Sequence, residues 1–148
     1  ESYVISNWGI ALRYFNVYGP REEHKGKMAS VAFQMTQKHK KGEDVFLFPN
    51  KPVRDFVYIK DVTNANIFAL LNYDDLKGKY YEVGFGESRP FEDILEFLEI
   101  PFKYTSVDLI PNGYQFYTCS DSKKWMKNWK PKWDLKSGIE EYKNYLNR

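Results

Sequence analysis

The sequence predicts an α/β fold, formed by one domain of 148 residues. Predicted strands alternate with predicted helices, and short loops join them, which is typical of this class. Apolar residues make up 43% of the chain and aromatic residues 18%, which is enough to bury a sizeable core. No internal repeat, low-complexity segment or long linker divides the chain, so residues 1–148 are expected to form a single domain.

The first third of the chain predicts a strand, a helix and a second strand. Residues 8–15 are mostly apolar, as in a buried strand, and lead into a turn at 17–20 and a charged loop at 21–27. From residue 28 to about 41, apolar residues among helix formers predict a helix that Gly42 closes. A short strand at 45–48 then enters a loop at 49–52.

The remaining two thirds predict further strand–helix pairs. Alternation at 54–59 predicts a strand, and Asp61 is expected to cap a helix that extends to Leu71. A strand at 79–83 ends in a turn at 84–86, and acidic residues after Pro90 predict the start of a helix. The last expected elements are a strand at 102–107, an irregular segment at 108–119, and helices at 121–128 and 135–147. Three tryptophans spaced i, i+4, i+8 predict a packing stripe on a helix: Trp125, Trp129 and Trp133.

Charge and composition exclude several classes of protein. There are 22 Lys and Arg against 20 Asp and Glu, a balance that fits neither an acidic tail nor a basic nucleic-acid coat. One cysteine and two histidines exclude a disulfide framework and a zinc site, so no metal is expected. Without a membrane-length apolar run or a signal peptide, the chain is expected to be soluble and cytoplasmic. It opens with Glu1 close to a strand, which favours a piece of a longer protein.

Asn16 is the first candidate for chemistry. It stands where a buried strand is expected to end, and ligands of open α/β sheets bind beyond the carboxyl ends of strands. The simpler interpretation is a turn asparagine that satisfies backbone groups.

Two lysines in the charged loop are the second candidate. Lys25 could serve as a general base if partial burial lowered its pKa. Lys25 and Lys27 could instead bind an anion near the start of the following helix. The alternative is a solvent-exposed charged loop without a functional role.

The segment 48–55 is the third candidate. Phe48, a flexible loop and Arg54 together could stack a base and neutralise a diphosphate, because a guanidinium suits phosphate geometry. The alternative is a hairpin loop with a surface charge pair between Arg54 and Asp55.

Two segments are similar to motifs of dinucleotide-binding enzymes, but neither matches its motif fully. The turn at 84–86 has the first two glycines of G-x-G-x-x-G, but position 89 is Arg. Tyr73 and Lys77 have the spacing of the Tyr-x-x-x-Lys pair of short-chain dehydrogenases, but the sequence between them predicts that they do not share a helical face.

The chain resembles the C-terminal half of the extended short-chain dehydrogenase/reductase family, the NAD(P)-dependent sugar-nucleotide epimerases and dehydratases. Four segments carry the resemblance, in order: LRYFNVYGPR at 12–21, RDFVYIKDV at 54–62, YEVGFG at 81–86 and DSKKWMKNWKPK at 121–132. The resemblance implies the substrate-binding portion of a Rossmann-type enzyme, with residues 1–20 as the last part of its dinucleotide-binding domain. The glycine-rich loop and the Tyr-x-x-x-Lys helix would lie upstream of Glu1.

Within that family, REEHKGKMASVAF at 21–33 is most similar to the ADP-heptose 6-epimerases. This similarity implies epimerisation of ADP-glycero-manno-heptose at C6 by transient oxidation and re-reduction. It implies NADP or NAD as the cofactor of the intact enzyme, a nucleotide-diphosphate sugar as ligand, and a homo-oligomer. Lys25 would be the catalytic acid/base and would also contact the cofactor, with Val17. The residues implied to bind substrate are Asn16, Lys27, Gln34, Phe48, Pro49, Asn50, Lys51, Arg54 and Tyr114.

Some positions depart from the pattern of the heptose epimerases. Lys27 and Gln34 stand where a serine and a histidine are expected, and the loop at 49–52 is short and lacks a glycine. A UDP- or dTDP-sugar epimerase or dehydratase therefore stays open. So does a non-catalytic module that binds a nucleotide sugar or associates with itself through an unpaired strand at 8–15.

Overall fold

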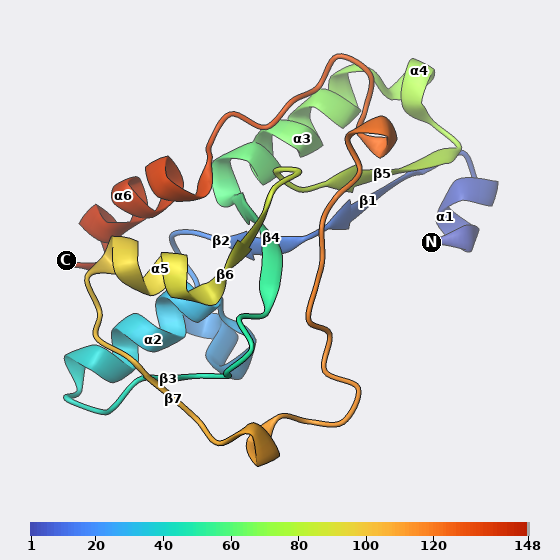
Figure 1. Cartoon of the computed structure of the whole chain (residues 1–148). Helices are drawn as coiled ribbons and strands as arrows, with labels where there is room; N and C mark the ends of the chain where they lie inside the picture. The colour runs from blue at the N-terminus through green and yellow to red at the C-terminus, as the bar shows by residue number, and fades with distance from the viewer. Residues whose placement is uncertain (148) are drawn as a thin grey trace.

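The computed structural model describes residues 1–147, which form a mixed α/β structure (Figure 1). It has seven short strands, which are β1 (Ile10–Tyr14), β2 (Asn16–Tyr18), β3 (Phe46–Leu47), β4 (Val53–Tyr58), β5 (Lys79–Val83), β6 (Ser88–Pro90) and β7 (Lys103–Tyr104). The α-helices are α1 (Ser2–Ser6), α2 (Val31–Lys40), α3 (Ile59–Leu71), α4 (Tyr73–Leu76), α5 (Phe91–Leu98) and α6 (Leu135–Leu146). Three 3-10 helices complete it: η1 (Glu23–Met28), η2 (Val107–Leu109) and η3 (Ser122–Lys124).

The strands form three small sheets. β1 pairs in parallel with β5, and β3 pairs in parallel with β7. The central sheet has the order β2-β4-β6, with β2 parallel and β6 antiparallel to β4. Within residues 1–147, β1 has a partner strand on one edge only, because β5 is its sole neighbour.

Two hydrophobic clusters form the core. The larger lies where α2, α5 and α6 meet the central sheet, and α5 packs against both other helices (Figure 1). The smaller joins α3 to β5 and to the segment that follows η3, with Val57, Val83, Met126 and Trp129 fully or nearly buried. The connection from β7 to η3 crosses from one cluster to the other. A bridge between Val53 and Tyr117 and hydrogen bonds from Arg54 and Asp55 attach it to β4.

Most expected elements are present, but the strand expected at 102–107 is limited to β7, and four further expectations were wrong. The strand expected at 8–15 is divided at Phe15 into β1 and β2, so Val17 and Tyr18 pair with Val57 and Tyr58 rather than forming a turn. The helix expected from Met28 begins at Val31, because the Ser30 hydroxyl accepts the Phe33 amide as an N-cap.

The third correction concerns Asp61, which does not cap α3. Tyr58 occupies the cap position, and Asp61 lies buried in the first turn. Its carboxylate accepts the backbone amides of Lys132 and Trp133 at 2.9 Å, and burial nevertheless raises its pKa above the usual value. Asp61 therefore attaches the C-terminal segment to α3.

The fourth correction concerns the helix expected at 121–128. Only η3 is helical there, and Asn128 adopts a left-handed backbone with φ 71°. Trp125 and Trp129 still pack edge to face with ring centroids 5.9 Å apart, and the Trp129 indole donates to Asn64 Oδ1 at 3.0 Å. Packing thus holds this segment in an irregular path, although the helical stripe is absent.

Candidate functional site

A cavity of about 180 Å³ opens between α2, β3 and the start of α5. Val31 and Met35 of α2 form one wall, and residues of β3 and the loop after it form another. Most of its lining is apolar or aromatic, and the side chains from the more distant segments are Phe91, Glu92 and Tyr114. A small apolar cavity with a few polar groups is the usual form of a small-molecule site.

Arg54 lies beside this cavity. Its side chain is buried, and its guanidinium carbon is 5.3 Å from the Tyr114 ring centroid and 5.7 Å from that of Phe91. It donates only to the backbone carbonyls of Val53 and Gln115. Within residues 1–147 no carboxylate lies within 4.0 Å of it, so the surface pair with Asp55 considered from the sequence does not form. A buried cation without an anion is costly, which indicates a site for an anionic ligand.

Phe48 and Tyr114 form an aromatic corner of the same cavity. Their rings meet edge to face with centroids 5.1 Å apart. The loop that follows Phe48 turns sharply, with left-handed backbones at Asn50 (φ 70°) and Lys51 (φ 45°), and both side chains are exposed. Pro49, Asn50 and Lys51 flank the cavity in sequence but do not line it.

Asn16 begins β2, but its amide already has partners. Nδ2 donates to the Asp55 carbonyl at 3.2 Å and to the Thr118 hydroxyl at 3.4 Å. This is the structural role that the sequence left open as the simpler interpretation. Within residues 1–147 no group donates to the carbonyl oxygen Oδ1, which can therefore accept a hydrogen bond from a ligand.

Lys25 and Lys27 lie exposed in η1, and the two ends of that segment are held by one carboxylate. Glu22 is 2% exposed, and its two oxygens accept the amides of Gly19 at 2.9 Å and Ser30 at 2.5 Å. The lysines therefore project from a loop whose base is fixed.

Gln34 closes the same segment from α2. Its Nε2 donates to the carbonyls of Lys27 at 3.2 Å and Ala29 at 2.6 Å. The structure thus brings together two groups of the expected site residues. Phe48, Arg54 and Tyr114 gather at the cavity, and Lys27 and Gln34 meet at the lysine-bearing loop.

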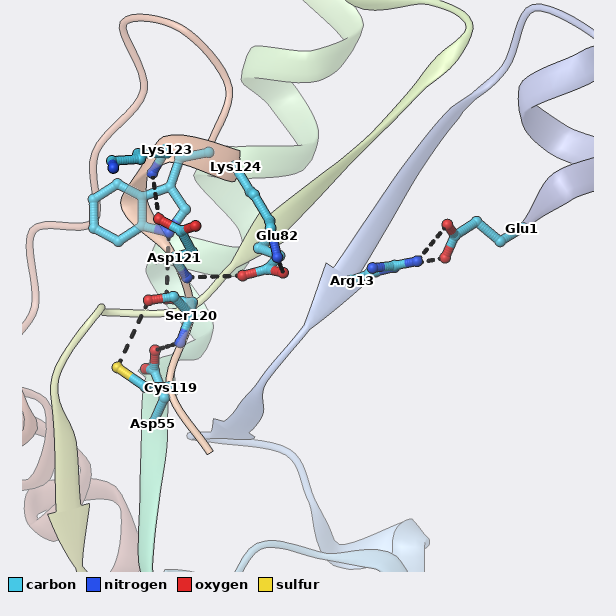
Figure 2. A network of polar contacts seen from close by, with 10 residues as sticks. Glu1, Arg13, Asp55, Glu82, Cys119, Ser120, Asp121, Lys123 and Lys124 are labelled. Carbon is cyan, nitrogen blue, oxygen red and sulfur yellow. Dashed lines mark hydrogen bonds and ion pairs between the residues drawn. The ribbon is translucent and has the colours of Figure 1, made fainter. Parts of the chain in front are cut away.

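A buried carboxylate organises the turn at 84–86 and the segment that leads into η3 (Figure 2). Asp55, fully buried, accepts the amides of Phe85 at 2.7 Å, Gly86 at 2.9 Å and Ser120 at 2.8 Å. A Cβ at Gly84 would lie 2.5 Å from Asp55 Oδ2, so only glycine fits there. In Figure 2 the neighbouring Glu82 accepts the Asp121 amide and faces Lys124, whereas the Arg13–Glu1 pair lies apart.

This arrangement decides whether the turn at 84–86 can hold a dinucleotide. Its amides donate to Asp55, so they are not free for a pyrophosphate. Val17, expected to contact the cofactor, is half-buried and packs against the smaller core cluster. The turn at 84–86 therefore does not hold the pyrophosphate of NAD(P), and we assign no step to that cofactor on this chain.

The Tyr73 and Lys77 pair also has a local role. The Lys77 ammonium lies 5.6 Å from the Tyr73 ring centroid, closer than the sequence led us to expect. However, Lys77 pairs with Asp74 and the Tyr73 hydroxyl donates to the Trp8 carbonyl. Within residues 1–147 no cluster of three potential metal ligands occurs, and no helix is long and apolar enough to cross a membrane.

Sequence reasoning missed part of the cavity. From the sequence, the residues of α2 and β3 that line the cavity were interpreted only as core residues. Glu92 was interpreted only as an acid in the first turn of a helix. No local signal identifies these residues, because the cavity forms only when three elements pack together.

Comparisons with known proteins identify the family of this chain. A model of the NAD dependent epimerase/dehydratase family matches residues 6–84, and the chain belongs to that family. An ADP-L-glycero-D-manno-heptose-6-epimerase from Brachyspira hyodysenteriae is 36% identical over 97% of this chain and 48% of its own length.

Solved structures show the same likeness. The ADP-L-glycero-D-manno-heptose-6-epimerase of Helicobacter pylori superposes with a TM-score of 0.81 at 34% identity, over 98% of this chain and 48% of that one. The UDP-glucose 4-epimerase of Thermotoga maritima, solved with UDP-glucose, superposes with a TM-score of 0.76. It is 27% identical over 94% of this chain and 46% of its own. The chain therefore spans about half the length of the relatives it matches.

Proposed function

We propose that this chain is the nucleotide-sugar-binding portion of an NAD(P)-dependent sugar-nucleotide epimerase that acts on ADP-glycero-manno-heptose at C6. The observation that carries the proposal is the buried guanidinium of Arg54, which has no carboxylate partner within residues 1–147 and lies beside an aromatic-lined cavity. A nucleoside diphosphate offers a planar base for the cavity and phosphates for the arginine. Likeness to two heptose epimerases supports the ADP-heptose choice.

The roles of the side chains follow from their positions. Arg54 binds the diphosphate, and Phe48 and Tyr114 pack against the base, with the loop of Pro49, Asn50 and Lys51 beside it. The sugar is assigned to the other group, where Asn16 offers Oδ1 and Lys27 and Gln34 border the lysine-bearing loop. Lys25, exposed on that loop, is the proposed acid/base.

We place the chain in the C-terminal half of such an enzyme, with residues 1–20 as the last part of its dinucleotide-binding domain. Two observations support this placement. β1 has β5 as its only partner strand within residues 1–147, which leaves one edge for a further parallel strand. The amides of the turn at 84–86 are already used, so the dinucleotide would have to be held by other residues. Oxidation and re-reduction of the sugar is therefore assigned to the whole enzyme.

Calorimetric titration of the chain with ADP and with UDP tests the proposal. We expect ADP to bind, and Arg54→Met to weaken it by about tenfold to a hundredfold, because a charge-assisted hydrogen bond contributes about 1.5–3 kcal/mol. Arg13→Met, at an exposed arginine paired with Glu1, is the matched control and should leave binding unchanged. Preference for UDP would favour the UDP-sugar alternative, and absence of binding to either would reject a nucleotide-sugar site.

A second candidate function is self-association, which the free edge of β1 favours. Three aromatic residues on or next to that strand are exposed. The exposed fractions are 79% for Tyr3, 68% for Trp8 and 47% for Tyr14. A strand with one unpaired edge and aromatic neighbours can add a strand from a second copy. Sedimentation of the chain over a range of concentrations distinguishes a homo-oligomer from a monomer, and Trp8→Ser should lower the association.

A further inference from the structure

Glu92 is a buried acid without a cation. It is 5% exposed, and within residues 1–147 no Lys, Arg or His nitrogen lies within 4.0 Å of its carboxylate. Oε1 accepts the Tyr104 hydroxyl at 3.1 Å, whereas Oε2 is buried and accepts no hydrogen bond from this part of the chain. A buried acceptor left unpaired costs free energy, so a donor is expected to reach it in some functional state.

The position of Glu92 shows where that donor would come from. Glu92 lines the cavity described above, in which the other side chains are apolar or aromatic. It lies in the first turn of α5, whose N-terminal end favours a negative charge. The helix therefore retains the carboxylate. Its Oε2 has no surface open to the cavity, so a ligand donor reaches this oxygen when the carboxyl group rotates toward the cavity.

Glu92 lines the cavity, whereas Arg54 lies behind two lining residues, Phe91 and Tyr114, and the two charges form no ion pair. Arg54 approaches Phe91 and Tyr114, and Glu92 approaches Tyr104, so each charge stays available. A ligand that satisfies both must carry an anionic group near the arginine and an N–H donor near the glutamate. A nucleoside diphosphate whose base has an amino group meets both requirements.

We infer that Glu92 selects the base of the bound nucleotide, with Oε2 accepting a hydrogen bond from the exocyclic amino group of adenine. The inference rests on the proposed function and names the residue that determines its base preference. Uracil and thymine carry their only N–H between two carbonyl oxygens, which a carboxylate repels. Guanine offers two adjacent donors that suit a free carboxylate, but Tyr104 already occupies one oxygen of Glu92. The single free oxygen matches one exocyclic amino group, which adenine and cytosine carry, and the likeness to two heptose epimerases favours adenine.

The test compares ADP with purine riboside 5′-diphosphate, which lacks only the amino group, by calorimetric titration of the chain. We expect ADP to bind about tenfold to a hundredfold more tightly. Glu92→Leu should bring the ratio of the two dissociation constants close to one, and Glu92→Gln, which keeps the shape and a neutral acceptor, should give an intermediate ratio. Glu96→Gln, at an exposed acid on the same helix, is the control and should keep the wild-type ratio.

A second readout separates recognition from folding. Because Glu92→Leu removes a buried acceptor without a donor, its thermal midpoint should equal or exceed that of the wild type while the preference for ADP is lost. Arg54→Met should weaken both ligands equally and keep their ratio. If the wild type binds both ligands equally well and Arg54→Met weakens both, the role of Glu92 is overturned and the proposed function stands. If neither ligand binds, the proposed function fails, and the inference fails with it.

Discussion

The guanidinium carbon of Arg54 lies 5.3 Å from the Tyr114 ring centroid, and Nη2 of the same side chain donates to the Gln115 carbonyl. This contact joins β4 to the connection between β7 and η3. One wall of the cavity therefore depends on a segment without regular secondary structure, which Arg54 and the Val53–Tyr117 bridge hold in place. A ligand anion at Arg54 would stabilise that wall as well as occupy the site.

Lys25→Ala tests the proposed acid/base. In a form of the protein that joins this chain to the dinucleotide-binding part of the family, we expect turnover to fall by about a hundredfold or more, because a positioned acid/base contributes about that much. Binding of ADP should stay unchanged, since Lys25 does not line the cavity. Lys38→Ala, at an exposed lysine on α2, is the control. Full turnover in the Lys25 variant would remove this role.

Glu22→Gln should loosen the lysine-bearing loop. The carboxylate accepts amides at both ends of that loop, and a carboxamide replaces one acceptor with a donor that faces an N–H. We expect faster amide hydrogen exchange at residues 23–28, and little change in α5, which exchange mass spectrometry can resolve. Glu43→Gln, at an exposed acid, should leave the pattern as it is. Uniformly faster exchange would mean that Glu22 stabilises the whole fold instead.

Asp55→Asn should destabilise the protein by about 2–3 kcal/mol. Asp55 accepts three backbone amides in a fully buried position, and the amide nitrogen of asparagine would confront one of these N–H groups. Urea unfolding measures the change, and Asp75→Asn on the surface of α4 is the matched control. A loss no larger than in that control would show that the network in Figure 2 contributes little.

Stability should fall at alkaline pH. Burial raises the pKa of Tyr58 to about 12, and it raises the pKa values of Tyr18 and Tyr142 further. A group with a raised folded-state pKa stabilises the fold fully below its unfolded pKa of about 10, and this stabilisation is lost as the pH rises through about 12. Tyrosinate absorbance and circular dichroism recorded together check this. These three tyrosines should ionise only as the circular dichroism of the fold is lost, and earlier ionisation would contradict the burial.

The fold was largely predictable from the sequence where local patterns decide it. The strands predicted at 54–59 and 79–83 match β4 and β5 at or near their observed bounds. The expectations failed where distant contacts decide the structure. Asp61 resembles an N-cap, but its carboxylate is used by the amides of residues 132 and 133. The segment 121–128 has helix formers, yet Trp129 is fixed by Asn64 in an irregular path.

The candidate site was predictable in part for a similar reason. Residue type identified Arg54 and Phe48, because an arginine and an aromatic ring near a loop are unusual enough to note. The lack of any acid near Arg54 is visible only in three dimensions, since the sequence places Asp55 next to it. In the strand those two side chains point to opposite faces, and Asp55 is used by three amides instead. Glu92 gave no usable signal, because any acid in a first turn has the same appearance.

The contact between Arg54 and Gln115 also has a consequence for the order of folding. It spans 61 residues, so a long loop must close before the wall that carries Tyr114 can form. Contacts within α3, α5 and their neighbouring strands are closer in sequence and form at a smaller entropic cost. The wall that carries Tyr114 lies in a connection without regular secondary structure, so it is expected to open in local unfolding events that leave both cores intact. Nucleotide binding would then slow the opening of this wall selectively.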